Sequence, residues 1–241
     1  MRAGIVAAVI WLCAAPVSAQ QNQSVVADAL HTVGGDFQHL IAWESGLTLG
    51  AATGVALGMV PHERDVSLRP QTDRIEDTFE AATVVGHGLT QLGGATAVFL
   101  IGHLAHQPRV DMLGLELMRA HTVNGVLTQG LKFAIGRTRP DGGPHSFPSG
   151  HTSAAFATAT VLQHDFGWTV GIPSYLIAGY VGASRAAENK HYASDVVVGA
   201  AVGFVSARAV TRPRSSHHAI TVAPVLGRST AGMVMTWDAG H

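Results

Sequence analysis

Apolar positions in this chain come in long blocks and do not alternate with polar ones. Mostly apolar, uncharged stretches cover residues 45–61, 81–108, 166–184 and 196–207, and the charged residues lie between and beyond them. The stretches are rich in Ala, Leu and Gly and lack the two-residue period of a half-buried strand. The pattern predicts an all-α fold, a helical bundle of about six core helices.

The two ends of the chain differ from this pattern. Arg2, a short apolar run and small residues up to Ala19 predict a secretory signal peptide over residues 1–19. An uncleaved anchor is the alternative, although the run is short for a membrane span. The only cysteine, Cys13, lies in this segment, so we expect no disulfide. In the tail, 213–241, apolar residues flank a turn-like segment at 227–230 and predict a short β-hairpin.

Between the ends we expect two regions. Residues 20–79 form N-terminal helices and a surface loop, and residues 80–212 form a catalytic helical-bundle core. The segment 61–77 is polar, contains two prolines and several charges, and predicts a loop or a helix entry. No residue pattern in that segment indicates catalysis.

Composition narrows the range of functions that the protein could have. The chain of 241 residues is 47% hydrophobic and 13% charged, so extensive burial in protein or in lipid is expected. Its formal net charge of -1 argues against a nucleic-acid partner, because binding phosphates of a polyanion needs a basic surface. Gly, Thr, Ser, Gln and His interrupt the apolar stretches, so both a membrane-integrated and a soluble bundle remain open.

Three short segments carry residues suited to an oxyanion. Lys132, Arg137 and Arg139 gather at the end of a helix-like run that Pro140 stops. The second segment, Pro148-Ser149-Gly150-His151, opens an apolar run and predicts a helix N-terminus, where free N–H groups and the helix dipole favour an anion.

The third segment is Ser184-Arg185 followed by His191 and Asp195. His191 and Asp195 are four residues apart and would share one face if that stretch is helical. A carboxylate in that position can fix the tautomer of the imidazole. Ser184 is expected to position Arg185.

Together these segments resemble the three-part signature of the type 2 phosphatidic acid phosphatase and vanadium haloperoxidase superfamily. The matching pattern is Lys132-x6-Arg139-Pro140, then Pro148-Ser149-Gly150-His151, then Ser184-Arg185-x5-His191-x3-Asp195, and the likeness covers roughly residues 80 to 210. The seven residues between Pro140 and Pro148 resemble the short spacer of small bacterial exported members.

The resemblance implies metal-independent phosphoryl transfer through a phosphohistidine, with no cofactor. His191 would attack phosphorus, Asp195 would orient the ring and stabilise the cation that forms, and His151 would protonate the leaving oxygen. A cradle would hold the phosphate oxygens: Lys132, Arg139, Ser149, the N–H of Gly150, and Arg185.

The expected function is hydrolysis of phosphate monoesters by an exported enzyme. The substrate would be an envelope lipid phosphate or a small phosphate ester, and the protein would be membrane-associated in the periplasm or envelope, with its site on the outer side of the inner membrane. A soluble broad-specificity acid phosphatase, a vanadate-dependent haloperoxidase with His191 as the vanadium ligand, and a non-catalytic scaffold are the alternatives.

Several other residues near the motifs are expected to have structural or peripheral roles. Arg137 is expected to be solvated at a helix end, although it could neutralise a second phosphate. His145, just before Ser149, is a candidate for a contact at the rim of the site. The other histidines, His87 included, are expected on the surface or satisfied in the core because they match no ligand spacing.

Overall fold

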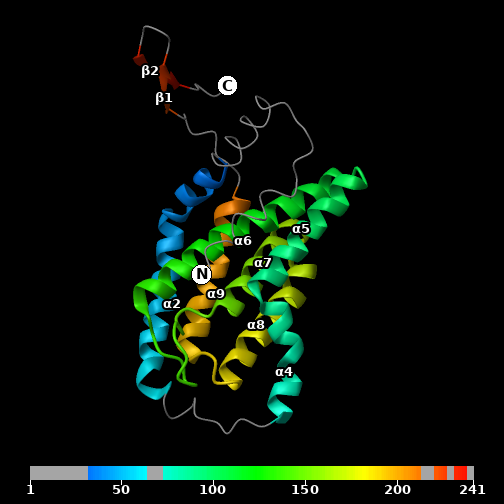
Figure 1. The fold of residues 1–241 in the computed structure, drawn as a ribbon, viewed down its shortest axis with the longest axis vertical. Coiled ribbons are helices and arrows are strands. Elements are labelled where there is room, and N and C mark those ends of the chain that lie inside the picture. The colour runs from blue at the N-terminus through cyan, green and yellow to red at the C-terminus, as the bar shows by residue number, and fades with distance from the viewer. Residues whose placement is uncertain (1–31, 64–72, 213–219, 227–230, 238–241) are drawn as a thin grey trace. The chain divides into compact units, whose positions relative to one another are not determined.

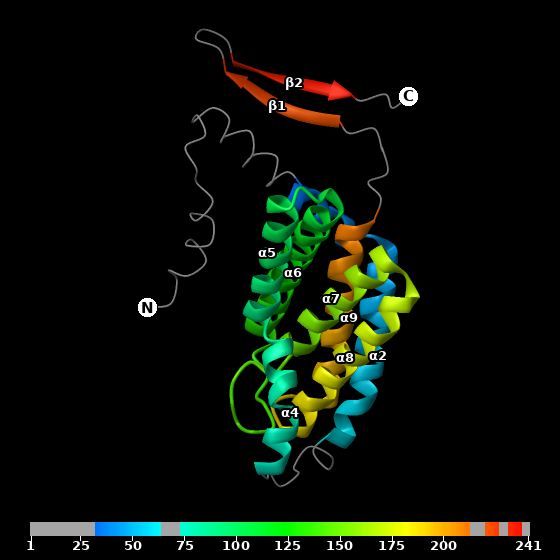
Figure 2. The same ribbon diagram turned by 90° about the vertical axis from the view of Figure 1, so that its right-hand side faces the viewer.

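The computed structural model describes residues 32–63, 73–212, 220–226 and 231–237. Contacts divide the chain into two units, Met1–Thr211 and Arg212–His241. The first unit is a bundle of α-helices (Figures 1 and 2), which confirms the predicted all-α class. After a helical segment at 32–40, its elements are α2 (Trp43–Met59), η1 (Val60–His62), α4 (Asp73–Gly86), α5 (Gly88–Leu104), α6 (Pro108–Ile135), α7 (Gly150–Phe166), α8 (Trp168–Ala187) and α9 (Ala193–Thr211).

Residues at the helix ends explain where the helices that carry the motifs begin and end. Pro108 occupies the first turn of α6, where its missing N–H costs no hydrogen bond. The predicted start of α7 is observed: Ser149 is the N-cap, and its side chain accepts a hydrogen bond from the N–H of Thr152. The expected apolar stretch at 81–108 is divided, because α4 ends at Gly86 and α5 begins at Gly88.

Helix α7 is the centre of the bundle, since it packs against α6, α8 and α9. The crossing of α7 and α9 is close because α9 presents glycine to α7. A Cβ added at Gly199 would lie 2.6 Å from the carbonyl oxygen of Ser149, and one at Gly203 would lie 2.1 Å from that of Ser153. The contact holds the beginning of α7 against the beginning of α9, where two of the motifs lie.

Small aliphatic side chains fill the space between these helices. Ala157 and Val161 of α7 pack in one buried cluster with Val123 of α6, and Val198 and Val202 of α9 pack in another with Ala56 of α2. Because α2 packs on α9, α2 shares the core of the motif-bearing helices.

Within the described residues, α9 is the one helix that is long and apolar enough by itself to cross a membrane, and 67% of its apolar window is buried in the protein. Two bent pairs would add a span each if each pair is one broken span. They are Thr32–Leu40 with Trp43–His62, bent by 56°, and Phe79–Gly86 with Gly88–Leu104, bent by 62°.

The second unit has two strands, β1 (Ile220–Leu226) and β2 (Ala231–Trp237). They pair antiparallel, with Ile220 opposite Trp237 and Leu226 opposite Ala231. The segment 1–19, where a signal peptide is expected, lies outside the described residues.

Candidate active site

Two loops bring the motifs together at one end of the bundle. The loop 136–149 follows α6, and the loop 188–192 joins α8 to α9. The N–H of Asp141 donates to the carbonyl of Asn189 (3.2 Å), and the N–H of Ser149 donates to the carbonyl of Asp195 (3.0 Å). These main-chain bonds place the start of α7 beside the start of α9.

Ser149 is completely buried at the beginning of α7. Its Oγ accepts hydrogen bonds from the Oγ1 of Thr152 (2.9 Å) and, at 3.5 Å, from the N–H of Thr152. The hydroxyl proton of Ser149 is therefore available to donate to an anion. Gly150 follows, and a Cβ added there would lie 3.7 Å from Cε of Lys132, so the helix start faces this lysine.

The stretch from His191 to Asp195 is only partly helical. Helix α9 begins only at Ala193, so His191 lies in the preceding loop and Asp195 lies in the first helical turn. The Oδ2 of Asp195 accepts a hydrogen bond from the N–H of Tyr192 (2.9 Å), which starts the helix at this point. The two side chains still meet, because His191 Nδ1 lies 3.7 Å from Asp195 Oδ2.

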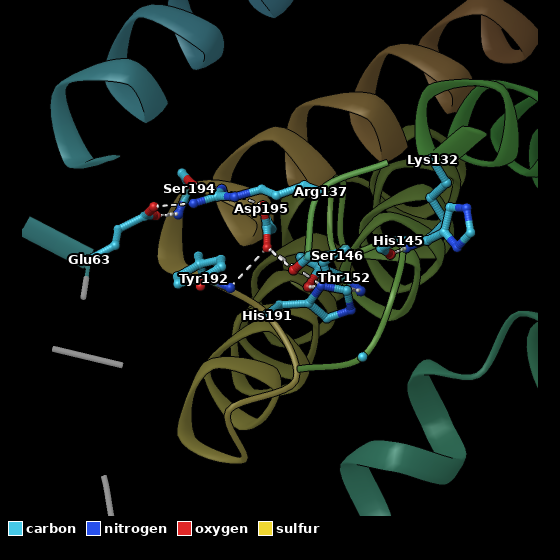
Figure 3. Close-up of polar contacts among 12 residues, drawn as sticks. Glu63, Lys132, Arg137, His145, Ser146, Thr152, His191, Tyr192, Ser194 and Asp195 are labelled. Atoms are coloured by element: carbon cyan, nitrogen blue, oxygen red, sulfur yellow. Dashed lines mark hydrogen bonds and ion pairs between the residues drawn. The ribbon is translucent and has the colours of Figure 1, made fainter. Parts of the chain in front are cut away.

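Asp195 is completely buried and its carboxylate is held by several donors (Figure 3). Ser146 Oγ donates to Oδ2, as does the N–H of Tyr192, and Arg137 Nη1 donates to Oδ1 at 2.7 Å. The expectation that Arg137 is solvated at a helix end is therefore wrong. Its guanidinium turns inward because two buried carboxylates, those of Asp195 and Glu63, attract it.

Glu63 is a residue of this site that sequence reasoning missed. Its side chain is 4% exposed, with Oε2 accepting from Arg137 Nη2 (2.6 Å) and Oε1 accepting from the N–H of Ser194 (2.7 Å). It belongs to the segment 61–77, in which no chemistry was expected. No local pattern could have revealed it, since Glu63 and Arg137 are 74 positions apart.

Arg185 is 4% exposed and is held by neighbours on three sides. Its Nε donates to Ser184 Oγ (3.2 Å), and its Nη2 donates to Glu188 Oε1 (2.6 Å) and to Thr83 Oγ1. Ser184 thus positions Arg185, in line with the role expected for it. Thr83 comes from α4, so this helix also supports the site.

Lys132 lies in the last turn of α6, facing the start of α7. Its Nζ donates to the carbonyl of His145 at 2.7 Å. The His145 ring packs edge-on against Phe133, with centroids 5.4 Å apart. Both rings border a cavity of about 450 Å³ that is also lined by Lys132 and Arg139. His145 therefore lies at the edge of the site, where a rim contact was expected.

His151 points from the first turn of α7 towards the break between α4 and α5. A Cβ added at Gly86 would lie 3.1 Å from Cβ of His151 and 2.5 Å from Cγ1 of Val181, so only glycine fits there. The next residue, His87, places its ring edge-on to His151 at a centroid distance of 5.6 Å. The histidine at this break was expected to have no role near the site.

The ionisable side chains of this site shift one another's pKa. Burial lowers the pKa of His151 to about 3, and the charges of Arg185, His87, His191 and Arg139 add to this shift. Both ring nitrogens of such an imidazole are uncharged near neutral pH, so one can accept a proton.

The same cations act on Lys132 and His191. The pKa of Lys132 is lowered to about 8. Burial is the main cause, the positive charge of Arg139 adds to the shift, and the negative charge of Asp195 opposes it. Burial also lowers the pKa of His191; Asp195 opposes this shift, whereas Lys132 and Arg139 add to it. The structure thus brings these predicted residues into one cluster with His151.

Three nitrogen atoms in this cluster have unmet hydrogen-bonding capacity. In the described part of the chain, the buried side-chain nitrogens without a hydrogen-bond partner are Arg139 Nε, His151 Nε2 and His191 Nδ1. Buried polar groups are nearly always paired, and His191 Nδ1 faces the Asp195 carboxylate, so the other two nitrogens indicate a site built for a polar ligand. Cationic groups and a helix N-terminus favour an anion. Across the residues described, no group of three or more His, Cys, Asp or Glu gathers to hold a metal ion.

Fold and site define a class: an α-helical bundle with a buried cationic site around two histidines at the start of a central helix. Residues 113–218 match the family model described as the PAP2 superfamily. The matched residues contain all three motifs, which confirms the resemblance seen in the sequence.

Curated relatives fit this assignment. The chain is 43% identical over 100 residues to lipid A 1-phosphatase of Porphyromonas gingivalis, covering 39% of this chain and 21% of that protein. It is 28% identical over 176 residues to probable diacylglycerol pyrophosphate phosphatase 1 of Schizosaccharomyces pombe, covering 53% of this chain and 63% of the relative. The chain therefore spans less than two thirds of each relative.

Solved structures share the fold. The crystal structure of Aquifex aeolicus LpxE superposes with a TM-score of 0.51 at 23% identity, over 63% of this chain and 93% of that one. A transmembrane PAP2 type phosphatidylglycerolphosphate phosphatase from Bacillus subtilis gives a TM-score of 0.52 at 21% identity, over 77% and 92%. Both comparisons show similarity of the helical-bundle fold.

Proposed function

We propose that this protein is a metal-independent phosphatase that hydrolyses phosphate monoesters through a phosphohistidine at His191. The observation that carries the proposal is that two buried nitrogens without a hydrogen-bond partner, Arg139 Nε and His151 Nε2, belong to the same cluster as His191, so one phosphate group can bind them while His191 attacks it. The match to the PAP2 superfamily over residues 113–218 and the names of the two phosphatase relatives support it.

His191 is the nucleophile. Its Nδ1 faces the Asp195 carboxylate, so the tautomer with a proton on Nδ1 is favoured and the lone pair lies on Nε2. Nε2 forms a bond to phosphorus while the bond from phosphorus to the ester oxygen breaks. Asp195 then stabilises the positive charge that develops on the ring.

His151 moves the protons. It donates one to the leaving oxygen in the first step and takes one from the water that cleaves the phosphohistidine in the second, which releases inorganic phosphate. Its pKa of about 3 without substrate, caused by burial and then by nearby positive charges, keeps the ring neutral. A bound phosphate dianion counters those charges and raises the pKa, so the substrate itself prepares the acid.

The cradle consists of the groups that face this position. Lys132, Arg139 and Arg185 neutralise the phosphate oxygens, and the hydroxyl of Ser149 and the N–H of Gly150 donate hydrogen bonds at the N-terminus of α7. In phosphoryl transfer, charge is spread over three equatorial oxygens, so fixed donors around them stabilise the transition state.

The substrate we propose is a lipid phosphate of the cell envelope. The curated relatives are named for phosphatases of lipid A and diacylglycerol pyrophosphate. Large apolar side chains are exposed on helices of the bundle, such as Leu57 (66%), Leu104 (77%) and Leu176 (70%), and suit contact with lipid. We place the protein in the envelope after removal of residues 1–19, with residues 80–212 as its catalytic core and the site on the outer side of the inner membrane.

Release of inorganic phosphate from a panel of lipid and soluble phosphates tests the proposal. The assay uses detergent-solubilised protein with a metal chelator, and His164→Ala, an exposed position late in α7, as the control for His191→Ala. We expect turnover of lipid phosphates by the wild type and by His164→Ala, with none by His191→Ala. Loss of activity in chelator, or normal turnover by His191→Ala, contradicts the mechanism.

A further inference from the structure

We infer that Glu63 and Arg137 are positioning residues that hold the Asp195 carboxylate towards His191. The inference rests on the proposed function of His191. Neither residue enters the reaction described above, and Glu63 lies outside the residues 113–218 that match the superfamily.

Arg137 is fixed by contacts of both terminal nitrogens and of the face of its guanidinium. Nη1 donates to Ser194 Oγ and to Asp195 Oδ1, each at 2.7 Å, and Nη2 donates to Glu63 Oε2 at 2.6 Å. The Cζ atom lies 4.0 Å from the ring centroid of Tyr192, a cation–π contact. An arginine held this way offers Asp195 a donor with one fixed direction.

Glu63 connects the end of α2 and η1 to the beginning of α9. Besides Arg137, it binds the N–H of Ser194 in the first turn of α9, where a negative charge is favourable. Figure 3 shows Arg137 between Glu63 and Asp195. With Oδ1 of Asp195 held from this side, its Oδ2 faces Nδ1 of His191. Rotation of the carboxylate would break the bond to Arg137.

The charges alternate along this chain of contacts: Glu63 is negative, Arg137 positive and Asp195 negative. The combined electrostatic field of these three charges acts on the His191 ring. The ring also faces the charged or titratable groups of Lys132, Arg139 and His151. Removing the Glu63 charge makes the surroundings of His191 more positive, whereas removing the Arg137 charge makes them more negative. A residue needed only for folding would not produce shifts of opposite sign.

The test compares pH profiles of kcat/KM for Glu63→Gln and Arg137→Gln. Because His191 must be neutral to attack, the acid limb reports its protonation. We expect this limb to move to lower pH in Glu63→Gln and to higher pH in Arg137→Gln, each by about half a pH unit. In both variants kcat falls about ten-fold with little change in KM, because the phosphate cradle is intact.

Three further variants serve as references. Glu44→Gln in the first turn of α2 and Arg109→Gln in α6 make the same chemical changes far from His191 and should leave the profile unchanged. Arg137→Lys keeps the charge but loses the forked geometry, so its acid limb stays at the wild-type position while kcat falls. If Arg137→Gln does not fold, Arg137→Lys and Glu63→Gln still decide the question.

An NMR titration of the His191 imidazole in histidine-labelled protein, assigned with His191→Gln, gives the same information without turnover. Shifts of opposite sign in the two variants support the inference even if the wild type hydrolyses no phosphate ester, a result that would refute the proposed function alone. Absent shifts, or shifts of the same sign, overturn the inference while leaving the phosphatase activity in place.

Discussion

The rings of His87 and His151 lie edge to face, with centroids 5.6 Å apart and planes at 75°. His87 is the residue between α4 and α5, and His151 is in the first turn of α7. The contact joins a solvent-exposed imidazole at a helix break to the half-buried imidazole that we assign as the proton donor. A charge on His87 therefore acts directly on the acid of the reaction.

Replacing His87 should change the pH dependence of the reaction. Burial is the main cause of the low pKa of His151, and a positive charge on His87 lowers it further. His87→Gln removes that charge, so the pKa of His151 rises and it keeps its proton to higher pH. We expect the basic limb of the kcat profile to move up by a few tenths of a pH unit. The exposed His103→Gln in α5 is the control, and an unchanged basic limb in His87→Gln contradicts the assignment of His151 as the acid.

Gly86 allows this contact, and a single methyl group there should disturb it. A Cβ at Gly86 would meet Val181 Cγ1 at 2.5 Å, whereas the same addition at Gly88 meets no atom within 4 Å. We expect Gly86→Ala to lower the free energy of unfolding by about 1–3 kcal/mol and to reduce kcat, because overpacking displaces His151. Thermal unfolding and phosphate release measure both effects. Equal results for Gly86→Ala and Gly88→Ala would show that the close approach does not matter.

The cations of the cradle should affect rate without abolishing it. A charge-assisted hydrogen bond contributes about 1.5–3 kcal/mol, so Lys132→Gln or Arg139→Gln should lower kcat/KM about ten- to one-hundred-fold. Competitive inhibition by inorganic phosphate should weaken in parallel, because product and transition state share these donors. Lys190→Gln removes a cation from an exposed ion pair with Asp141 and should keep most activity. Unaltered phosphate inhibition in both cradle variants would contradict their role.

The helix start in the second motif and the helical class could be predicted because their signals are local. Ser149 and Gly150 mark a helix start by their own chemistry, and α7 begins there. The apolar blocks likewise predicted helices, and the bundle is observed. Blocks of this kind do not specify helix breaks, so the division at His87 was not foreseen.

Long-range contacts were missed for a physical reason. The ion pair of Glu63 and Arg137 joins residues 74 positions apart, and each looks like an ordinary surface charge in its own segment. Only the folded bundle brings the two together and buries Glu63. The start of α9 was likewise left open by the sequence: the side chain of Asp195 binds the N–H of Tyr192 and begins the helix there, so His191 lies in the preceding loop. An Asp side chain can form hydrogen bonds to several nearby backbone groups, and a helix cap forms only with one of these choices.

The most direct test of the account is to trap the covalent intermediate. Wild-type protein is mixed with a radiolabelled lipid phosphate, quenched in alkali and digested, and the labelled peptide is sequenced. The account predicts an alkali-stable, acid-labile phosphoryl group on His191 that is absent from His191→Ala and present in His164→Ala. Label on another residue, or phosphate release by His191→Ala at the wild-type rate, would contradict it.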